Sequence, residues 1–539
     1  MPTGRAAERA SDANGSSDDG APRVAVVGAG LGGLAAAVRL AAGGCEVELF
    51  EKGTGPGGKA GSLELSGYRF DTGPSLFTLP QVFEELLATA GRRLEDYLEL
   101  VPLDPVFRHE FSDGTVFRAP AGPARFAGEA ERVFGVERAR VEAYLRYCER
   151  LYRIAAPVFL NNSLHELETF LQPRVMFSIL RSLQIDPFRS MARANQAKLG
   201  DPRLVQLFNR LASYNGSNPY RAPATFNLIG AVEQVFGAYG VRGGIYAVPR
   251  MLAELAGELG VTLRYGAPVE RILRDSSGHR DGNLGERAAG RRAAGGRVCG
   301  VRVGGEERRF DAVVTNIDPE RTYRELLEDT EAPWYRRYLE SEPSSSAIVF
   351  LWGLDREFPE LGLHNMFYSA EYRDEFSRIF DAAEVSVDPT VYLNIGCRVT
   401  PEDAPTGGEN WFVLINAPPD RGQDWADLSR RVRKAVLGKL ARVLGCDLET
   451  HLRVERVLTP AELAERTGSF RGSLYGLASN RVGAAFSRHP NRSRRYPGLY
   501  FCGGAAHPGG GMPLAVRSGA LAAELLLRRA RSSRTAPVS

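Results

Sequence analysis

The first strong hydrophobic pattern in the chain begins directly after Arg23. Residues 24–27 form a continuous run of small and β-branched apolar side chains, which predicts a buried strand. Residues 31–42 predict a helix of small apolar residues, and residues 45–51 predict a second strand. The order strand, helix, strand indicates a β-α-β unit and therefore an α/β fold.

The remaining pattern predicts a hairpin, a helical region and further strands. Residues 62–70 alternate around the turn Ser66-Gly67, which is typical of a β-hairpin. Between about 80 and 235 apolar residues recur three and four positions apart, so we expect this region to be mostly helical. The later strands are expected at 261–265, 298–303, 312–314, 346–352, 391–395, 411–415 and 498–502, before a final helix from 513 to about 531.

Composition narrows the class of protein. The chain has 539 residues, and its 68 Lys and Arg nearly balance its 65 Asp and Glu, so the net charge of +3 gives little support for nucleic-acid binding. The longest apolar stretch, residues 25–44, is interrupted by glycines and Arg39, and we expect no transmembrane helix. Six scattered cysteines, no spacing typical of a metal site and no secretory pattern at the N-terminus predict a reduced, cytoplasmic protein.

A glycine motif joins the first strand to the first helix. Gly28, Gly30 and Gly33 stand in the Gly-x-Gly-x-x-Gly register, in which glycines permit a tight turn, the approach of a diphosphate and close helix packing. The helix N-terminus offers free N–H groups to the phosphates. Glu51 ends the second strand, where its carboxylate can accept hydrogen bonds from a ribose. These positions predict a dinucleotide site, with an empty Rossmann-like turn as the alternative.

Three later segments favour a flavin over a nicotinamide dinucleotide. Gly57-Gly58-Lys59 forms a second glycine turn with a cation that can approach the diphosphate, and residues 70–75 (FDTGPS) expose backbone after the hairpin. Residues 501–513 combine a strand, a glycine loop and a helix start, and that helix N-terminus can stabilise the anion of a reduced flavin ring. Each segment alone can be an ordinary turn, and their order along the chain carries the prediction.

With these motifs the chain resembles the bacterial carotenoid desaturases, the phytoene desaturase type of FAD-dependent oxidoreductase in the amine oxidase-like flavoprotein superfamily. The resemblance covers residues 23–527, and it is most specific in 24–44, 70–77, 242–252 and 500–526. It implies FAD as the cofactor and dehydrogenation of carotenoid C–C bonds as the activity. The residues that it assigns to FAD are Gly28, Gly30, Leu31, Gly32, Gly33, Glu51, Lys52, Gly58, Lys59, Gly73, Pro74, Ser75, Val269, Gly503, Gly504, Met512 and Pro513.

The resemblance also implies how the chain is divided. It indicates a Rossmann-like FAD-binding domain built from discontinuous segments, beside a mixed-sheet and helical lobe for substrate and membrane. We expect the FAD-binding domain in 23–85, 240–320 and 470–531, the substrate lobe in 86–239 and 321–469, disordered tails in 1–22 and 532–539, and an exposed loop in 276–296.

Within the family, residues 213–220, 236–239 and 363–368 look closest to the desaturases that act on 1-hydroxylated carotenoids and form the 3,4 double bond. This narrower activity is an alternative to general phytoene desaturase-like dehydrogenation. An amine oxidase on the same fold is a rival function, disfavoured because residues 507–511 contain no aromatic side chain. A prenyl-binding protein that has lost the cofactor is a second rival, and the intact glycine motif argues against it.

A carotenoid C–C bond offers no acidic proton, so the expected route is hydride transfer to the flavin with loss of a proton from the neighbouring carbon. Such a step depends on holding the substrate against the cofactor in a dry tunnel, and no catalytic triad is visible. His507 is a weak candidate for the proton acceptor, because a loop histidine more often orients backbone. Tyr214, Asn218 and Tyr239 are weak candidates for the tunnel, with ordinary packing as the alternative.

Partners follow from the resemblance and from one apolar segment. The single Gly-x-Gly-x-x-Gly motif and the lack of a Cys-x-x-Cys argue against a flavin-disulfide reductase with its own nicotinamide site. The resemblance implies that electrons leave to a quinone or to oxygen. Residues 171–185 combine large apolar side chains with Arg174 and Arg181, which predicts a helix that lies in the membrane interface or forms a buried lid. We therefore expect peripheral contact with the inner membrane face.

Overall fold

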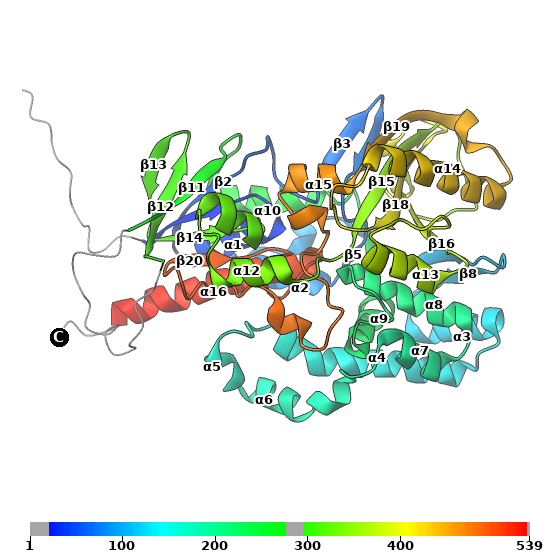
Figure 1. The fold of residues 1–539 in the computed structure, drawn as a ribbon, viewed down its shortest axis with the longest axis horizontal. Coiled ribbons are helices and arrows are strands. Elements are labelled where there is room, and N and C mark those ends of the chain that lie inside the picture. Colours follow the sequence, from blue (N-terminus) through cyan, green and yellow to red (C-terminus); the bar gives the residue numbers. More distant parts are fainter. Residues whose placement is uncertain (1–20, 276–294, 536–539) are drawn as a thin grey trace, which may run out of the picture.

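The computed structural model describes residues 21–275 and 295–535. The expected tail at 1–22 and the expected loop at 276–296 therefore lie almost wholly outside the described residues. The last helix, α16 (Met512–Thr535), continues past the predicted end near 531, so the expected tail was wrong for residues 532–535. In Figure 1 this helix runs along the lower edge of the first sheet.

The predicted β-α-β unit lies at the centre of a five-stranded parallel sheet with the strand order β10-β2-β1-β14-β20. Alternate residues of its central strand face opposite layers, as expected for a sheet covered on both faces. Val24 and Val26 pack with α1, α10 and α16, whereas Ala25 and Val27 pack with a three-stranded antiparallel sheet. These elements are β1 (Arg23–Val27), α1 (Leu31–Ala41), β2 (Glu46–Phe50), α10 (Ala247–Glu258), β10 (Thr262–Arg264), β11 (Val269–Arg274), β12 (Val298–Val303), β13 (Glu306–Arg309), β14 (Ala312–Thr315) and β20 (Leu499–Phe501).

Helices α1 and α16 approach each other closely beneath this sheet. A Cβ atom on Gly519 would lie 2.1 Å from the carbonyl oxygen of Gly32, so only glycine fits at this contact. The close packing brings the first helix and the last helix together, although nearly the whole chain separates them in sequence.

A second, seven-stranded mixed sheet lies beside the first, in the upper right of Figure 1. The predicted strands at 346–352, 391–395 and 411–415 are confirmed in it as β15, β17 and β18. Helix α14 packs on one face, and the β3–β4 hairpin, which was also predicted correctly, packs on the other. These elements are β3 (Ser62–Leu65), β4 (Tyr68–Asp71), β15 (Ser346–Leu354), β16 (His364–Phe367), β17 (Val391–Ile395), β18 (Glu409–Ala417), α14 (Trp425–Leu444) and β19 (Leu452–Leu458).

The region from 80 to 235 is mainly helical, as predicted, and α3, α4, α7, α8 and α9 form the lower right of Figure 1. The prediction missed three short strands there, β6 (Leu100–Pro102), β7 (Phe107–Glu110) and β8 (Val116–Ala119). Strand β7 pairs with β16, which is far away in sequence. A four-residue strand is too short to show a clear alternation of apolar and polar residues, so the sequence pattern did not reveal it. The helices are α2 (Pro80–Ala88), α3 (Pro123–Phe134), α4 (Arg138–Phe159), α5 (Leu167–Phe170), α6 (Pro173–Leu180), α7 (Met191–Leu199), α8 (Pro202–Asn209) and α9 (Leu228–Gln234).

The remaining short elements include a small three-stranded sheet with the order β5-β9-β6. Strand β9 pairs with both β5 and β6, so the expected boundary between lobes at 239 and 240 falls inside a strand. These elements are β5 (Phe77–Thr78), β9 (Ala238–Val241), α11 (Pro319–Arg321), α12 (Pro333–Glu340), α13 (Tyr372–Ser377) and α15 (Pro460–Thr467).

The expected helix over 171–185 is wrong as a single element. Helix α6 begins at Pro173, whose missing N–H group suits the first turn of a helix and not its interior. A separate 3-10 turn, Ser182–Ile185, follows, and it ends at Asp186 in the left-handed conformation. The segment is therefore a helix and a turn.

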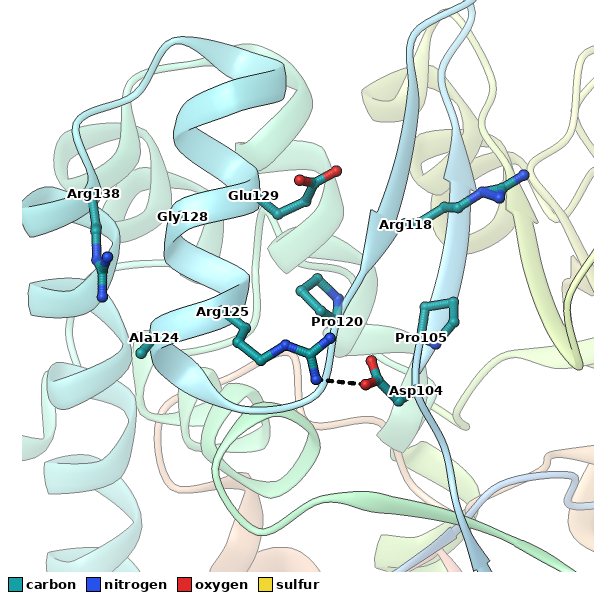
Figure 2. Close-up of a pocket in the computed structure, with 9 residues that line it drawn as sticks. All are labelled: Asp104, Pro105, Arg118, Pro120, Ala124, Arg125, Gly128, Glu129 and Arg138. Atoms are coloured by element: carbon teal, nitrogen blue, oxygen red, sulfur yellow. Dashed lines mark hydrogen bonds and ion pairs between the residues drawn. The ribbon is translucent and has the colours of Figure 1, made fainter.

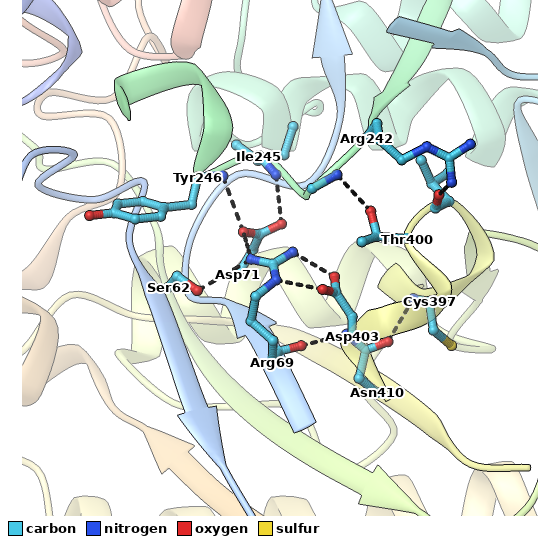
Figure 3. Close-up of polar contacts among 12 residues, drawn as sticks. Ser62, Arg69, Asp71, Arg242, Ile245, Tyr246, Cys397, Thr400, Asp403 and Asn410 are labelled. Atoms are coloured by element: carbon cyan, nitrogen blue, oxygen red, sulfur yellow. Dashed lines mark hydrogen bonds and ion pairs between the residues drawn. The ribbon is translucent and has the colours of Figure 1, made fainter. Parts of the chain in front are cut away.

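A partly buried polar cluster joins the hairpin to the rest of the molecule, as Figure 3 shows. Asp71 accepts hydrogen bonds from the backbone N–H groups of Ile245 (2.8 Å) and Tyr246 (3.2 Å). Arg69 donates to both carboxylate oxygens of Asp403, at 2.6 and 2.5 Å. Asp71 thus holds the turn before α10 in place.

Candidate flavin site and substrate cavity

The glycine turn between β1 and α1 has the geometry that the motif predicts. Gly28 has a φ of +96°, which side-chain-bearing residues rarely adopt. A Cβ on Gly33 would lie 2.0 Å from the carbonyl oxygen of Gly28, so the third glycine lets the helix pack onto the turn. Gly30 precedes the first helical residue, no side chain caps the helix there, and Gly30 lines the adjacent cavity. The turn therefore presents backbone to a ligand at a helix N-terminus.

The carboxylate of Glu51 is oriented by this turn. Its Oε2 accepts from the N–H of Ala29 at 2.7 Å, and its Oε1 accepts from the N–H of Gly53 at 2.8 Å. Each carboxylate oxygen can accept a further hydrogen bond. A fixed carboxylate with free acceptor capacity at the end of β2 fits the ribose hydroxyls of FAD.

A cavity of about 370 Å³ extends from the glycine turn to the second sheet. Twelve of the residues predicted to bind FAD line it: Gly30, Leu31, Gly32, Gly58, Lys59, Gly73, Pro74, Ser75, Gly503, Gly504, Met512 and Pro513. At Gly73 a Cβ would lie 1.9 Å from the carbonyl oxygen of Lys59. The backbone at Gly73 therefore packs directly against the backbone at Lys59 in this wall of the cavity. Such a cradle fits a long, flat cofactor.

The other predicted cofactor residues lie outside the lining of the cavity. Gly28 and Gly33 shape the turn, and Glu51 lies at the end of β2. The Lys52 ammonium donates to the carbonyl oxygen of Glu465 at 3.1 Å, and burial lowers its pKa. Val269 begins β11 and is partly buried.

Lys59 is a partly buried cation in the cavity wall. Its Nζ donates to the carbonyl oxygens of Ser473 and Leu474, both at 2.8 Å. Burial lowers the pKa of Lys59 to about 8, against the opposing effect of Asp318. The side chain therefore ties the second glycine turn to residues 473 and 474 while it lines the cavity.

Helix α16 begins at the cavity. Gly510, Gly511, Met512 and Pro513 all line it, and the N–H of Ala515 bonds to the carbonyl oxygen of Gly511. The helix N-terminus carries a partial positive charge. The structure therefore places it where it can stabilise negative charge on a bound ring system.

Several lining residues were not predicted from the sequence. Asn316 and Asp318 follow the carboxyl end of β14, the edge at which parallel sheets bind ligands, and this position was a usable signal. A Cβ on Gly30 would lie 2.5 Å from Asn316 Nδ2. The far part of the cavity is lined by residues that only tertiary contacts bring together, among them Phe107, Val349, Met366, Tyr392, Phe412, Leu414 and Tyr475.

The weaker candidates are placed differently. Tyr214 lines the cavity, whereas Asn218 and Tyr239 do not. Asn218 Oδ1 accepts from the N–H of Tyr220 within its own turn, and Tyr239 is paired between β5 and β6. His507 is buried outside the lining residues, its Nε2 lies 2.8 Å from the carbonyl oxygen of Asn162, and burial lowers its pKa to about 3.

A wider pocket of about 640 Å³ lies on the surface between α3 and the β7–β8 hairpin. Figure 2 shows its charged side chains, including the ion pair between Asp104 and Arg125. None of the predicted site residues lines it. We therefore place the chemistry in the cavity at the glycine turn.

The parallel sheet, the glycine turn and the carboxylate at the end of β2 define a Rossmann-type dinucleotide-binding fold. Residues 31–527 match the family of flavin containing amine oxidoreductases, and the chain belongs to this family. The cofactor predicted from the sequence, FAD, is thereby confirmed, and the protein is an FAD-dependent oxidoreductase.

Curated relatives cover nearly the whole chain. A "1-hydroxycarotenoid 3,4-desaturase" from a Flavobacterium species is 39% identical over 93% of this chain and 98% of its own. A "zeta-carotene-forming phytoene desaturase" from Myxococcus xanthus is 35% identical over 94% of both chains. A "4,4'-diapolycopene oxygenase" from a Methylomonas species is 34% identical over 93% of this chain and 97% of its own.

Solved structures share the fold at low sequence identity. An oxidoreductase from Methanosarcina mazei has a TM-score of 0.59 and 15% identity, covering 94% of this chain and 100% of its own. A putrescine oxidase bound to putrescine has a TM-score of 0.60 and 16% identity, covering 94% of this chain and 99% of its own. Within residues 21–275 and 295–535, every helix is too short or too polar to span a bilayer.

Proposed function

We propose that this protein is a carotenoid desaturase, which removes two hydrogens from a C–C bond of a polyene. The observation that carries the proposal is the 39% identity to a 1-hydroxycarotenoid 3,4-desaturase over almost the full length of both chains. The apolar far part of the cavity supports it, because Phe107, Met366, Phe412 and Leu414 offer a hydrocarbon surface beside the flavin site.

The division of labour follows from the site. When bound, FAD supplies the hydride acceptor. The cavity wall holds the substrate against that acceptor and keeps water away from it. The glycine backbones at one end position the cofactor, and the apolar side chains at the other end position the polyene. Electrons then pass to a quinone or to oxygen.

The 3,4-desaturation of a 1-hydroxycarotenoid is the narrower form of the proposal. The relative with that name is more similar to this chain than the named phytoene desaturase is, at 39% against 35% identity. The oxygenase from Methylomonas is 34% identical to this chain. Addition of oxygen to the carotenoid is therefore the alternative reaction that the experiment must distinguish from 3,4-desaturation.

Expression in cells that accumulate phytoene, and separately a 1-hydroxycarotenoid, tests both forms. We expect the 1-hydroxycarotenoid to gain a 3,4 double bond, which pigment extraction and mass spectrometry detect as the loss of two hydrogens and a red-shifted spectrum. Conversion of phytoene alone would retain desaturation and refute the narrower form. A product that has gained oxygen, or no change in either pigment, would contradict desaturation.

An exposed apolar segment supports contact with a membrane. Leu171, Met176, Phe177 and Phe188 are 76%, 52%, 56% and 79% exposed, and they lie in and around α6 at the lowest edge of Figure 1. Arg181 lies 4.4 Å from the ring centroid of Phe177. Aromatic side chains beside cations suit the headgroup region of a bilayer, and a carotenoid dissolves in the hydrocarbon interior next to that region. We propose that this segment touches the cytoplasmic face of the inner membrane.

The double substitution Phe177→Ser and Phe188→Ser is expected to weaken binding to anionic liposomes by at least roughly tenfold and by up to about a thousandfold, because each Phe contributes about 2 kcal/mol when fully buried and about 1.4 kcal/mol is a factor of ten. Liposome co-sedimentation measures the effect. Val387→Ser is the matched control, since Val387 is 79% exposed and far from this segment in sequence. Equal sedimentation of all three proteins would contradict the proposed contact.

A further inference from the structure

A buried ion pair belongs to the wall of the cavity. Arg210 and Glu233 are only 3% and 2% exposed, and Arg210 Nη2 donates to both carboxylate oxygens at 2.7 and 2.9 Å. Arg210 lines the cavity, and Glu233 does not. A buried ion pair contributes little net stability, because desolvation offsets the attraction. A cavity wall that bound only a hydrocarbon would be lined by apolar side chains. The buried pair therefore indicates that the ligand carries a polar group.

The hydrogen bonds around the pair include one from Arg210 Nη1 to Tyr214 Oη at 3.4 Å, and they leave Arg210 Nε without a partner among the described residues. Glu233 also accepts from Tyr214 Oη at 2.6 Å and from Gln234 Nε2 at 3.1 Å. The guanidinium of Arg210 lies 4.4 Å from the ring centroid of Phe107. Its Nε is buried. Because buried N–H groups are nearly always paired, this N–H is suited to an oxygen atom on a ligand.

A second series of hydrogen bonds begins at Ser75, in the turn at residues 70–75 that lines the flavin site. Ser75 Oγ lies 2.6 Å from Tyr392 Oη, which in turn lies 2.8 Å from His364 Nδ1. Burial lowers the pKa of His364 to about 3, so its ring is neutral and Nδ1 can accept a hydrogen bond from the Tyr392 hydroxyl. Tyr392 and Ser75 both line the cavity, and the rings of Tyr392 and Phe107 are 6.3 Å apart. Phe107 therefore has both Arg210 and Tyr392 as neighbours.

We propose that Arg210, Tyr214 and Tyr392, named here the hydroxyl-binding group, bind a hydroxyl at the end of the polyene and so select an oxygenated substrate. The substrate oxygen accepts from Arg210 Nε, and its proton is donated to a tyrosine oxygen. This inference rests on the proposed function. In a 1-hydroxycarotenoid a single carbon separates C1 from the 3,4 bond, so the hydroxyl must bind close to the flavin when that bond is oxidised. The hydrogen bond between Ser75 and Tyr392 connects the hydroxyl-binding group to the flavin site.

The test compares flavin-loaded protein on two substrates in liposomes, a 1-hydroxycarotenoid and the same polyene without the hydroxyl. We expect the wild type to favour the hydroxylated polyene in kcat/KM. Tyr214→Phe and Tyr392→Phe should each lower that preference about tenfold or more, since a site built for a hydroxyl discriminates strongly against its absence. Tyr144→Phe is the control, because Tyr144 is buried and bonds to Asn195 at 2.8 Å outside the cavity lining.

Flavin content and far-UV circular dichroism show whether each variant is folded, and rates are expressed per bound flavin. If the wild type uses both polyenes equally, or if both phenylalanine variants keep the wild-type preference, the inference is overturned while desaturation stands. If flavin-loaded wild type converts neither polyene, the proposed function itself fails. A loss of preference in Tyr144→Phe as large as in the other variants would also count against the inference, because it would show a general packing effect.

Discussion

Gly30→Val is expected to abolish flavin binding and, with it, all oxidoreductase activity. A Cβ at this position would lie 2.5 Å from Asn316 Nδ2, and Gly30 lines the cavity where the diphosphate must approach the backbone. The added methyl groups would fill the space that the phosphates need. The absorption spectrum of the purified protein and the flavin released by heat both measure the loss.

Gly257→Val is the matched control for this variant. Gly257 lies in α10 of the same domain, and a Cβ there meets nothing within 4 Å. Because valine has a somewhat higher helix propensity than glycine, the substitution should leave the helix as stable as before or slightly more stable, and the flavin should stay bound. Wild-type flavin content in Gly30→Val would show that the cofactor does not lie on this turn.

Arg210→Met is expected to destabilise the protein by about 3–5 kcal/mol, because it leaves the Glu233 carboxylate buried without its cation. Although burial alone lowers the pKa of Arg210, Glu233 raises it well above its usual value, so the arginine is charged. The double variant Arg210→Met, Glu233→Gln removes both charges and should recover most of the loss. The midpoint of urea unfolding, followed by flavin fluorescence, measures each effect.

The double variant also shows whether the destabilisation of Arg210→Met comes from the unpaired charge of Glu233. A double variant as unstable as Arg210→Met alone would mean that packing of Arg210 against Phe107, and not the buried charge, dominates. A single variant as stable as the wild type would mean that water reaches Glu233. Either result would remove the electrostatic basis of the hydroxyl-binding group.

The local part of the fold could be predicted from the sequence. The continuous apolar run at 24–27, the glycine turn and the strand ending at Glu51 gave the β-α-β unit, because all the signals are adjacent in the chain. Strand β7 was missed since its partner β16 lies more than two hundred residues away. The helix over 171–185 was wrong because Pro173 starts a new helix inside an otherwise uniform apolar segment.

The cofactor half of the site could be predicted in the same way, and the substrate half could not. Gly30, Gly58 and Gly503 belong to glycine-rich turns that stand out in the sequence. Arg210 and Tyr392 have no local signature, because their environment is created by the packing of helices against the second sheet. A buried charge beside an apolar cavity becomes visible only when burial and partners are known.

Anaerobic mixing of flavin-loaded protein with a 1-hydroxycarotenoid in liposomes tests the central claim most directly. Our account predicts that the oxidised flavin absorption disappears while the polyene spectrum shifts to longer wavelength, with one new double bond for each flavin reduced. Putrescine, mixed in the same way, should leave the flavin oxidised. Reduction by the amine and none by the carotenoid, or a changed carotenoid without flavin reduction, would contradict the account.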